Sequence, residues 1–409
     1  MSPSTIKNID FYLGRPLCFI LTAYDRLKRF VFGKPSKKEV RKIVFIKLVE
    51  QGATVLAYPS LKRAVDAVGS DNVYFCVFKE NRPILDILDI IPAKNIFEIS
   101  NDNPLVFARD MLCFFFRSRR LKIDTSIDME FFSRASAIIS YLCGASNRIG
   151  YHRYTSEYPY RGNLMTQRVQ YNPYIHVAKA YMILTEAAFM SPDEIPVAKI
   201  KTDTLKLYFA KLASLQENLQ KVKDMLQEHG LSEFGNHLVI LNPNAGDMLP
   251  LRKWAAENFV RLAKRLLESD PNIAIVLTGA LSEQAAVESI RREIGSDRTV
   301  NLAGKTTLKE LLTLYSIADV LVTNDSGPGH FATLTDIAEV ILFGPETPDL
   351  FGPIGRNVEY VCVELSCSPC VNVFNHRFSP CKDNVCMKSI SADSVFEKVT
   401  HLLSVKHRS

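Results

Sequence analysis

The sequence predicts an α/β protein with two doubly wound domains, each built on a parallel sheet. A chain of 409 residues exceeds the size of one ordinary hydrophobic core, so two domains are expected. Apolar segments of strand length alternate with helical patterns along most of the chain, which favours parallel strands joined by crossover helices. Glycine-containing loops follow several of these strands, at the sheet edge where α/β proteins bind ligands.

The predicted elements follow one another in the order that this architecture needs. In the first half we predict strands at 43–48, 73–78 and 123–127, and helices at 54–68, 104–120 and 132–142. A long helical pattern over 204–229 then ends at Gly230, as helices often do. In the second half we predict strands at 237–242, 273–278, 318–323 and 339–343, and helices at 255–268, 282–293, 308–317 and 331–337.

These patterns also set the expected domain boundaries. We expect five parts: a basic amphipathic segment (1–40), an N-terminal Rossmann-like domain (41–200), a linker helix (201–235), a C-terminal Rossmann-like domain (236–365) and a cysteine-rich segment with a closing helix (366–409).

The composition is that of an ordinary globular protein, with 47% hydrophobic and 23% charged residues. The net charge of +6 is too small to indicate nucleic-acid binding, although it suits a phosphorylated or membrane-bound substrate. No apolar run has the length of a transmembrane helix, and the start of the chain lacks the order of a signal peptide. A cytoplasmic protein is therefore expected.

The basic N-terminal segment has the pattern of an amphipathic helix. Its apolar face and the cations around it are Leu17, Ile20, Leu21, Tyr24, Leu27 and Val31, with Arg15, Arg26, Lys28, Arg29, Lys34, Lys37 and Lys38. Such a helix either lies on an anionic membrane surface or packs against the protein's own body. The sequence leaves both alternatives open.

The loop after the strand at 318–323 is the most informative segment. It leads straight into a short helix, so the first backbone N–H groups of that helix have no intrahelical partners and can bind a phosphate. The candidate residues are Asp325, Ser326, Gly327, Pro328, Gly329 and His330, the last through its side chain. The alternative is an ordinary turn with Ser326 as a helix cap.

Other strand ends carry loops of unusual content. In the second half these loops contain Asn244, Gly246, Arg252 and Lys253, and then Gly279 and Glu283. Three glycine-containing loops on one sheet indicate a nucleotide site more strongly than any single loop does. In the first half, the loop after residues 43–48 contains Lys47, Glu50, Gln51 and Gly52, which we expect on the side of the second substrate.

Several motifs are shared with one known family. In the second half they are Asn242–Gly246, Lys253–Trp254, Glu257–Phe259, Leu302–Gly304, Asp325–His330 and Leu342–Pro345. Looser landmarks in the first half are Ile43–Lys47, Gly52, Tyr58–Leu61, Ile127–Glu130, Ser133–Arg134 and Arg148–Gly150. Over about residues 41–400 the chain resembles glycosyltransferase family 9, the heptosyltransferases of lipopolysaccharide core assembly.

The resemblance implies a GT-B fold and an inverting sugar transfer, typically of heptose from ADP-heptose to the lipopolysaccharide core or a related envelope glycan. The implied partners are a nucleotide diphosphate sugar and a lipid-linked acceptor, with no nucleic acid. The protein would work in the cytoplasm. The membrane alternative for the basic N-terminal helix would place it on the cytoplasmic face of the inner membrane.

The resemblance also implies roles for donor-site residues, with no catalytic metal required. Arg252 or Lys253, together with the amides of the Asp325 loop, would stabilise the diphosphate leaving group. Glu283 would accept hydrogen bonds from ribose or sugar hydroxyls. The alternative for Lys253 and Glu283 is a solvated charge at the start of a helix.

The chain departs from the family at the general base. The family places an Asp directly after the first-domain loop glycine, but here that position is Ala53, which accepts no proton. We hypothesise that Glu50 replaces this Asp and that Asp128 is the reserve candidate. The alternative is a nucleotide-sugar-binding homologue with weak or no catalysis.

The candidate acceptor-binding residues are Lys47, Gln51, Gly52, Glu130 and Arg134. Arg134 follows Asp128 and Glu130 closely, so these side chains would hold acceptor hydroxyls or a phosphate together. The alternative is a salt bridge within the domain. The polar and aromatic segment 151–161 is a further candidate acceptor-binding loop.

Eight of the nine cysteines fall into two groups. Four have the spacing Cys367-x2-Cys370-x10-Cys381-x4-Cys386, which predicts a possible structural zinc site, because disulfides do not persist in a reducing cytoplasm. Cys18, Cys76, Cys113 and Cys143 lie in apolar surroundings and are predicted core residues. A Rossmann oxidoreductase is disfavoured, because no Gly-x-Gly-x-x-Gly follows the first strand.

Overall fold

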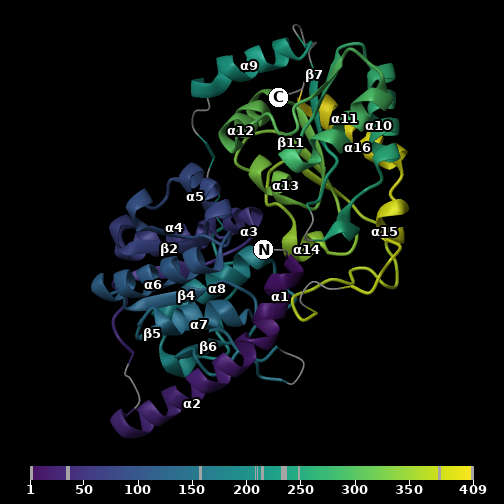
Figure 1. Ribbon diagram of the computed structural model, residues 1–409. Helices are drawn as coiled ribbons and strands as arrows, with labels where there is room; N and C mark the ends of the chain where they lie inside the picture. The colour runs from purple at the N-terminus through teal and green to yellow at the C-terminus, as the bar shows by residue number, and fades with distance from the viewer. Residues whose placement is uncertain are drawn as a thin grey trace. The chain divides into compact units, whose positions relative to one another are not determined.

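The computed structural model describes residues 3–33, 37–155, 159–207, 209, 211–212, 216–231, 237–246, 249–375 and 379–406. The chain divides into two compact units, Met1–Tyr208 and Phe209–Ser409, and each unit is described by itself (Figure 1). Each contains a six-stranded sheet whose paired strands run parallel, as the alternation of strand and helix patterns predicts.

The sheet of unit 1 has the order β3-β2-β1-β4-β5-β6. Its strands are β1 (Ile43–Ile46), β2 (Val73–Phe78), β3 (Ile96–Ile99), β4 (Thr125–Asp128), β5 (Asn147–Tyr151) and β6 (Gln167–Val169). Its helices are α1 (Pro3–Tyr12), α2 (Gly14–Phe32), α3 (Gln51–Leu56), α4 (Tyr58–Val68), α5 (Arg82–Leu88), α6 (Pro104–Arg120), α7 (Arg134–Leu142) and α8 (Val177–Phe189). The strand order reverses between β1 and β4, and ligands bind at such a switch point in doubly wound sheets.

The sheet of unit 2 has the order β12-β11-β10-β7-β8-β9, with its switch point between β7 and β10. Its strands are β7 (His237–Asn242), β8 (Ile273–Leu277), β9 (Thr299–Asn301), β10 (Val320–Asn324), β11 (Ala338–Leu342) and β12 (Val358–Val361). Its helices are α9 (Leu219–Glu228), α10 (Ala256–Ser269), α11 (Gln284–Ile294), α12 (Leu308–Ile317), α13 (Gly327–Ala332), α14 (Pro348–Phe351), α15 (Val385–Lys388) and α16 (Ala392–Lys406).

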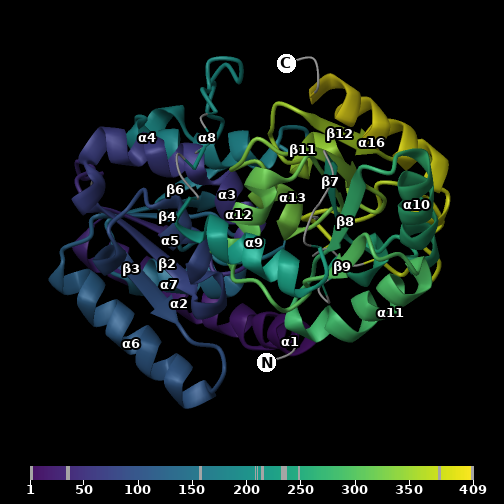
Figure 2. The ribbon, with the colours of Figure 1, turned by 90° about the horizontal axis from the view of Figure 1, so that it is seen from above.

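Helices cover both faces of each sheet, which explains why the central strands read as continuous apolar runs. Every residue of β1, β2, β8, β10 and β11 is buried. In unit 2, the apolar side chains of α10, α11 and α16 form one hydrophobic core with the sheet, and Figure 2 shows α9, α12 and α13 on the opposite face. The expected α/β architecture is therefore confirmed in both units.

Three helix predictions are wrong in extent, and one of them, at 331–337, is observed as α13 (Gly327–Ala332). The helix predicted over 54–68 is broken at Ala57 into α3 and α4, because Pro59 in the first turn of α4 donates no backbone hydrogen bond to the preceding turn. Of the helix predicted over 204–229, the described residues contain α9 and a single preceding turn at Gln216–Asn218, while residues 208, 210 and 213–215 lie outside the described part of the chain. Residues 201–205 form a turn in which Thr204 Oγ1 donates to the carbonyl of Lys201, an interaction that competes with helix formation.

Cysteine burial follows the prediction with one exception. Cys18, Cys76 and Cys143 are buried, whereas Cys113 is exposed on the outer side of α6. The apolar character of α6 misled the prediction, because Leu105, Leu112 and Phe116 on this helix are also exposed. Among the described residues, no helix is both long and apolar enough to cross a membrane.

A buried carboxyl group in β11 gives the first testable prediction. Glu339 is 1% exposed, and burial raises its pKa well above the usual range. Below the pKa of the unfolded chain, about 4.3, both states carry the proton; above it only the unfolded state readily loses the proton, so folding stability falls as pH rises. We expect Glu339→Gln to gain stability over wild type as the pH rises above about 4.3, by up to about 1.4 kcal/mol per pH unit.

Denaturant unfolding at several pH values measures this difference. The control is Glu359→Gln in the neighbouring strand β12, whose carboxylate is partly exposed and lies 2.8 Å from Lys398 Nζ. The control should show no such gain with pH. Parallel stability curves for Glu339→Gln and wild type would refute the prediction.

Candidate functional site

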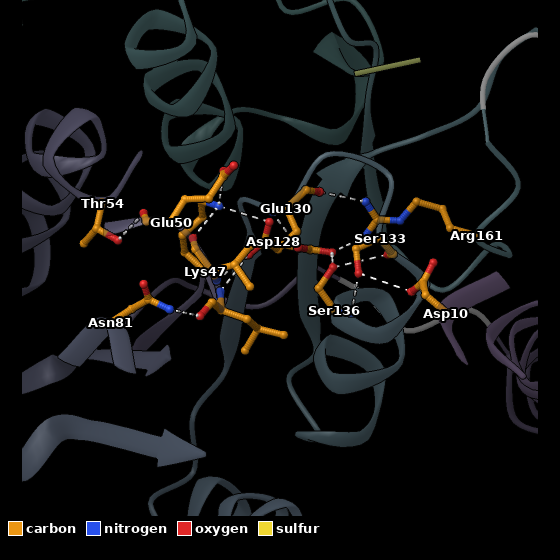
Figure 3. A network of polar contacts seen from close by, with 12 residues as sticks. Asp10, Lys47, Glu50, Thr54, Asn81, Asp128, Glu130, Ser133, Ser136 and Arg161 are labelled. Carbon is orange, nitrogen blue, oxygen red and sulfur yellow. Dashed lines mark hydrogen bonds and ion pairs between the residues drawn. The ribbon is translucent and has the colours of Figure 1, made fainter. Parts of the chain in front are cut away.

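The loops after β1 and β4 meet at the switch point of unit 1. Because Ile46 pairs with Asp128, the residues that follow these two strands lie next to each other. Glu130 Oε1 accepts from the backbone N–H groups of Leu48 (2.7 Å) and Val49 (3.2 Å). Glu130 therefore shapes the loop that leads to α3 (Figure 3).

Lys47 completes this arrangement. Its ammonium group is almost fully buried and donates to Glu130 Oε2 (3.1 Å) and to the carbonyl of Val49 (2.8 Å). Glu50 Oε2 lies 3.4 Å from the same ammonium group. The structure thus brings Lys47, Glu50 and Glu130 together from two strand ends, as the positions of the predicted loops required.

Glu50 is the accessible carboxylate of this cluster. Its side chain is 19% exposed, and the residue precedes the first turn of α3 with φ 72° and ψ 91°. A non-glycine residue with positive φ is strained by about 1–3 kcal/mol, and such strain is concentrated at functional sites. The backbone conformation of Glu50 is therefore a second reason, besides its position, to consider this side chain functional.

The strain at Glu50 gives a second prediction. Both Glu50→Ala and Glu50→Gly remove the carboxylate, but only glycine tolerates a positive φ without steric cost. We expect Glu50→Gly to be more stable than Glu50→Ala by about 1 kcal/mol in denaturant unfolding. Equal stability of the two variants, or a more stable alanine variant, would contradict the strained conformation.

Asp128 has a different environment. It is fully buried and its carboxylate accepts from Arg161, from Ser136 Oγ (2.9 Å) and from the backbone N–H of Glu130 (3.0 Å). Burial raises the pKa of Asp128, and the Arg161 guanidinium opposes this shift. A general base must lie within hydrogen-bond reach of the acceptor hydroxyl, so these contacts favour Asp128 as a buried support for the β4 loop.

The other candidates of unit 1 are placed as follows. Arg134 is 1% exposed and its guanidinium lies 2.9 Å from Asp10 of α1, so the salt bridge within the domain is the alternative that the structure favours. An acceptor would have to displace this pair to reach Arg134. Gln51 Nε2 donates to the carbonyl of Glu80 (2.7 Å), and Gly52 is buried in α3. Of the candidate loop 151–161, residues 156–158 lie outside the described residues.

The loops after β7 and β10 meet at the switch point of unit 2. Asn324, the last residue of β10, connects them: its Nδ2 donates to the carbonyl of Asn244 (3.3 Å) and its Oδ1 accepts from the backbone N–H of Trp254 (3.0 Å). Asn324 thereby ties the Asn244 loop and the segment after Arg252 to the start of the Asp325 loop.

Arg252 is the cation that points to this loop. Its guanidinium lies 3.6 Å from the Asp325 carboxylate and 3.7 Å from that of Glu346, and it donates to the carbonyl of Ala245 (3.3 Å). Lys253, by contrast, is exposed. Of the two cations left open by the sequence, the structure therefore brings Arg252 to the Asp325 loop.

Glu346 lies beside the same groups. Burial, with the Asp325 carboxylate beside it, raises the pKa of Glu346 well above its usual range, although Arg252 opposes the shift. The Arg252 guanidinium thus faces both the Asp325 and the Glu346 carboxyl groups.

Asn244, Gly279 and Glu283 converge beside these groups. A Cβ atom on Gly279 would lie 3.1 Å from both Asn244 Nδ2 and Glu283 Oε2, so glycine lets the two side chains approach the β8 loop. Glu283 Oε2 accepts from the backbone N–H of Ala280 (2.8 Å), which orients the carboxylate. Asn244 Nδ2 is buried and has no hydrogen-bond partner among the described residues, so it is a donor available to a ligand.

The Asp325 loop enters α13 as predicted, although α13 begins at Gly327 and not at Phe331. Ser326 is the N-cap residue, but its side chain makes no capping hydrogen bond and donates to the carbonyl of Asn324 (3.1 Å). The alternative of Ser326 as an ordinary side-chain cap is therefore wrong. Gly329 allows close packing of α13 on the sheet, since a Cβ there would lie 2.9 Å from Ile341 Cδ1, and His330 is buried in the same helix.

The predicted zinc site is not formed in the described part of unit 2. No group of three or more His, Cys, Asp or Glu side chains there has an arrangement that holds a metal ion. Cys386 is buried on α15, whereas Cys367 and Cys381 are exposed, and Cys381 Sγ donates to the carbonyl of Asp383 (3.0 Å). Cys370 Sγ lies 3.4 Å from Ser379 Oγ. Cys370 and Cys381 are thus engaged with polar groups of their own loop, and the described residues do not form a tetrathiolate site.

Two residues of these sites were missed by the sequence-based interpretation, and a third was given no role. Arg161 was considered only as the end of a loop, and its ion pair with Asp128 carries no sequence signal because 33 positions separate the two residues. Glu346 directly follows the recognised motif Leu342–Pro345, and this position was the available signal. Asn324 begins the recognised stretch that continues through Asp325 to His330, but no contact was assigned to it.

Comparisons with known proteins agree with this arrangement. Residues 118–377 match the family model described as glycosyltransferase family 9 (heptosyltransferase). Lipooligosaccharide heptosyltransferase 2 of Campylobacter jejuni is 29% identical over 177 residues, which are 42% of this chain and 53% of the relative. The matched region thus spans about half the length of this curated relative.

Solved structures resemble the chain over a longer range. The ADP-heptose lipopolysaccharide heptosyltransferase II of E. coli has a TM-score of 0.65 at 19% identity, covering 90% of this chain and 99% of that one. A family 9 glycosyl transferase of Veillonella parvula has a TM-score of 0.64 at 17% identity, again covering 90% and 99%. These similarities establish a two-domain α/β fold of the GT-B class.

Proposed function

Because the chain belongs to glycosyltransferase family 9, we propose that it transfers heptose from ADP-heptose, with inversion, to a lipopolysaccharide core or related envelope glycan. The observation that carries this proposal is the convergence, at the switch point of unit 2, of Arg252, the Asp325 loop and Asn244 Nδ2, which has no hydrogen-bond partner in the described part of the chain. Such a combination of cation, main-chain amides and buried donor suits a nucleotide diphosphate.

In this proposal the donor lies on unit 2. The diphosphate accepts from the amides at the start of α13 and from Arg252, whose positive charge offsets the charge that grows on the leaving group. The Asn244 side chain donates a hydrogen bond to an oxygen of the nucleotide sugar. Glu283, held by the Ala280 amide, accepts from a ribose or sugar hydroxyl. Gly246 and Gly279 leave the space that the nucleotide sugar requires, Gly329 lets α13 pack closely on the sheet, and the His330 side chain adds a hydrogen-bond donor from α13.

The acceptor hydroxyl is activated by unit 1 in this proposal. Glu50 takes the proton as the hydroxyl attacks the anomeric carbon and the bond to the diphosphate breaks, so the anomeric configuration is inverted. Lys47 and Glu130 hold the loop that carries Glu50, and Gln51 and Gly52 line the same loop. Glu50 thus does the work that the Asp at the position of Ala53 does in the family.

The protein is proposed to act in the cytoplasm on a lipid-linked glycan. No cofactor is required for the transfer, since Arg252 and main-chain amides supply the stabilisation of the leaving group. We expect activity to persist in excess EDTA. Loss of activity in EDTA, restored by one divalent cation, would contradict metal-independent transfer.

Two measurements with the purified chain test the function. ADP-heptose should raise the melting temperature more than UDP-glucose or GDP-mannose does, because a ligand that binds the folded state stabilises it by about 2.7 kcal/mol at 100 times its Kd. Addition of a heptose-deficient core oligosaccharide should then release ADP, and the anomeric configuration of the product is read by NMR. Binding without ADP release would favour the inactive homologue, and a preference for another nucleotide sugar would reject the proposed donor.

A further inference from the structure

Helix α2 packs on unit 1 through its small and polar residues. The buried residues of this helix are Gly14, Cys18, Thr22 and Asp25. A Cβ on Gly14 would lie 2.8 Å from Arg134 Cβ, so glycine allows α2 to approach α7 closely. Thr22 Oγ1 accepts from the backbone N–H of Asn163 (3.0 Å). These contacts fix which face of α2 is turned toward the protein (Figure 1).

The opposite face of α2 is apolar and exposed, the reverse of the usual arrangement in a globular protein. Its large exposed side chains are Leu17, Phe19, Ile20, Tyr24, Leu27, Phe30 and Val31, and Leu13, just before the helix, extends the same surface. Leu27 is 62% exposed and Phe30 is 89% exposed. At about 100° per residue, these positions form one continuous surface centred opposite Cys18. We call it the α2 apolar face.

Cations border this face on both sides. Arg15 and Arg26 are exposed along one border, and Lys28 is exposed along the other. The one acidic residue of α2, Asp25, lies on the packed side, where its carboxylate is 2.5 Å from Arg29 Nε. The α2 apolar face and its borders therefore carry positive charge and no negative charge.

We propose that α2 docks unit 1 on an anionic lipid membrane. The helix lies in the plane of the interface, its apolar face enters the boundary between headgroups and acyl chains, and Arg15, Arg26 and Lys28 contact lipid phosphates. The charge complementarity decides in favour of lipid, because a wide apolar surface with cations along both borders is the pattern of interfacial helices. The docking does not depend on the proposed sugar transfer.

Vesicle co-sedimentation of the full chain tests this assignment. We expect binding to vesicles of phosphatidylcholine with phosphatidylglycerol, weaker binding to phosphatidylcholine alone, and weaker binding to the anionic vesicles as salt increases. The double substitution Ile20→Glu and Leu27→Glu should lower the vesicle affinity at least about tenfold, because two apolar side chains no longer insert. Arg26→Glu with Lys28→Glu should abolish the preference for anionic lipid.

A matched control is Leu112→Glu on α6, since Leu112 is 56% exposed on the same unit, outside the α2 apolar face. This variant should bind vesicles like wild type, and all variants should melt like wild type because the substituted side chains are exposed. Unchanged vesicle binding by Ile20→Glu with Leu27→Glu would overturn the proposal. So would an absence of wild-type binding to anionic vesicles. A dimer in analytical ultracentrifugation that the same double substitution dissociates would then assign the α2 apolar face to a second copy of the chain.

The two proposals fail separately. Transfer to a soluble core oligosaccharide should be unaffected by Ile20→Glu with Leu27→Glu, and vesicle binding needs neither donor nor acceptor. A chain that binds anionic vesicles but transfers no sugar would therefore retain the docking surface while the proposed function is rejected.

Discussion

Glu50→Gln should lower kcat for sugar transfer by about 100-fold to 10,000-fold, the usual contribution of a general base. Glutamine has the size of glutamate but accepts no proton at neutral pH. Lys47 keeps its contacts with Glu130 Oε2 and the Val49 carbonyl in the variant, so the loop should stay in place. The rate of ADP release under saturating donor and acceptor measures the effect, and the affinity for ADP should be unchanged.

Two further variants make this experiment specific. Glu80→Gln removes an exposed carboxylate close to the same loop and should leave kcat unchanged. Ala53→Asp in the Glu50→Gln background restores the carboxylate at the position that the family uses, and we expect it to recover part of the lost rate. Wild-type turnover by Glu50→Gln would remove Glu50 from the mechanism and leave the reaction without the proposed base.

Arg252→Ala should weaken ADP binding by about 10-fold to 100-fold, since hydrogen bonds to charged groups contribute about 1.5–3 kcal/mol. The guanidinium lies between Asp325 and Glu346 and is the cation that the structure brings to the Asp325 loop. Its removal takes away the proposed partner of the diphosphate and leaves two carboxyl groups close together. Calorimetric titration with ADP, well below the melting temperature of the variant, measures the loss.

The neighbouring residue provides the control. Lys253→Ala removes an exposed cation one position away and should change the ADP affinity by less than about threefold, as a screened surface charge does. Arg252→Lys keeps the charge but loses the planar fork, so it should recover only part of the affinity. Strong loss of affinity in Lys253→Ala with normal affinity in Arg252→Ala would place the diphosphate elsewhere.

Sequence and structure agree best where a physical rule acts locally. Val73–Phe78 and His237–Asn242 were predicted with their observed ends, because buried parallel strands require continuous apolar runs. The helix at Pro104–Arg120 was also correct, with proline at its start and basic residues in its last turn. The break between α3 and α4 at Ala57 was not predicted. Pro59 indicated this break, but the apolar periodicity across it was given more weight.

The candidate sites were predictable to the extent that topology decides them. A residue directly after a parallel strand lies at the ligand edge of the sheet, so Lys47, Asn244 and Asp325 were located without knowledge of any side-chain contact. Which cation faces the Asp325 loop was not predictable, because the direction of a side chain in a short turn depends on packing. Arg252 and Lys253 are equivalent in the sequence and differ in the fold.

The amino-acid sequence alone determined the α/β class, the loops that carry the sites and the absence of the usual Asp at Ala53, because these follow from local patterns and residue identity. Tertiary structure decided the partners of buried charges, such as Asp128 with Arg161, because such pairs form between distant segments. It also decided the outward direction of the α2 apolar face. That direction depends on which surface of α2 fits against α7, and Gly14 and Thr22 provide that fit while the apolar side chains remain exposed.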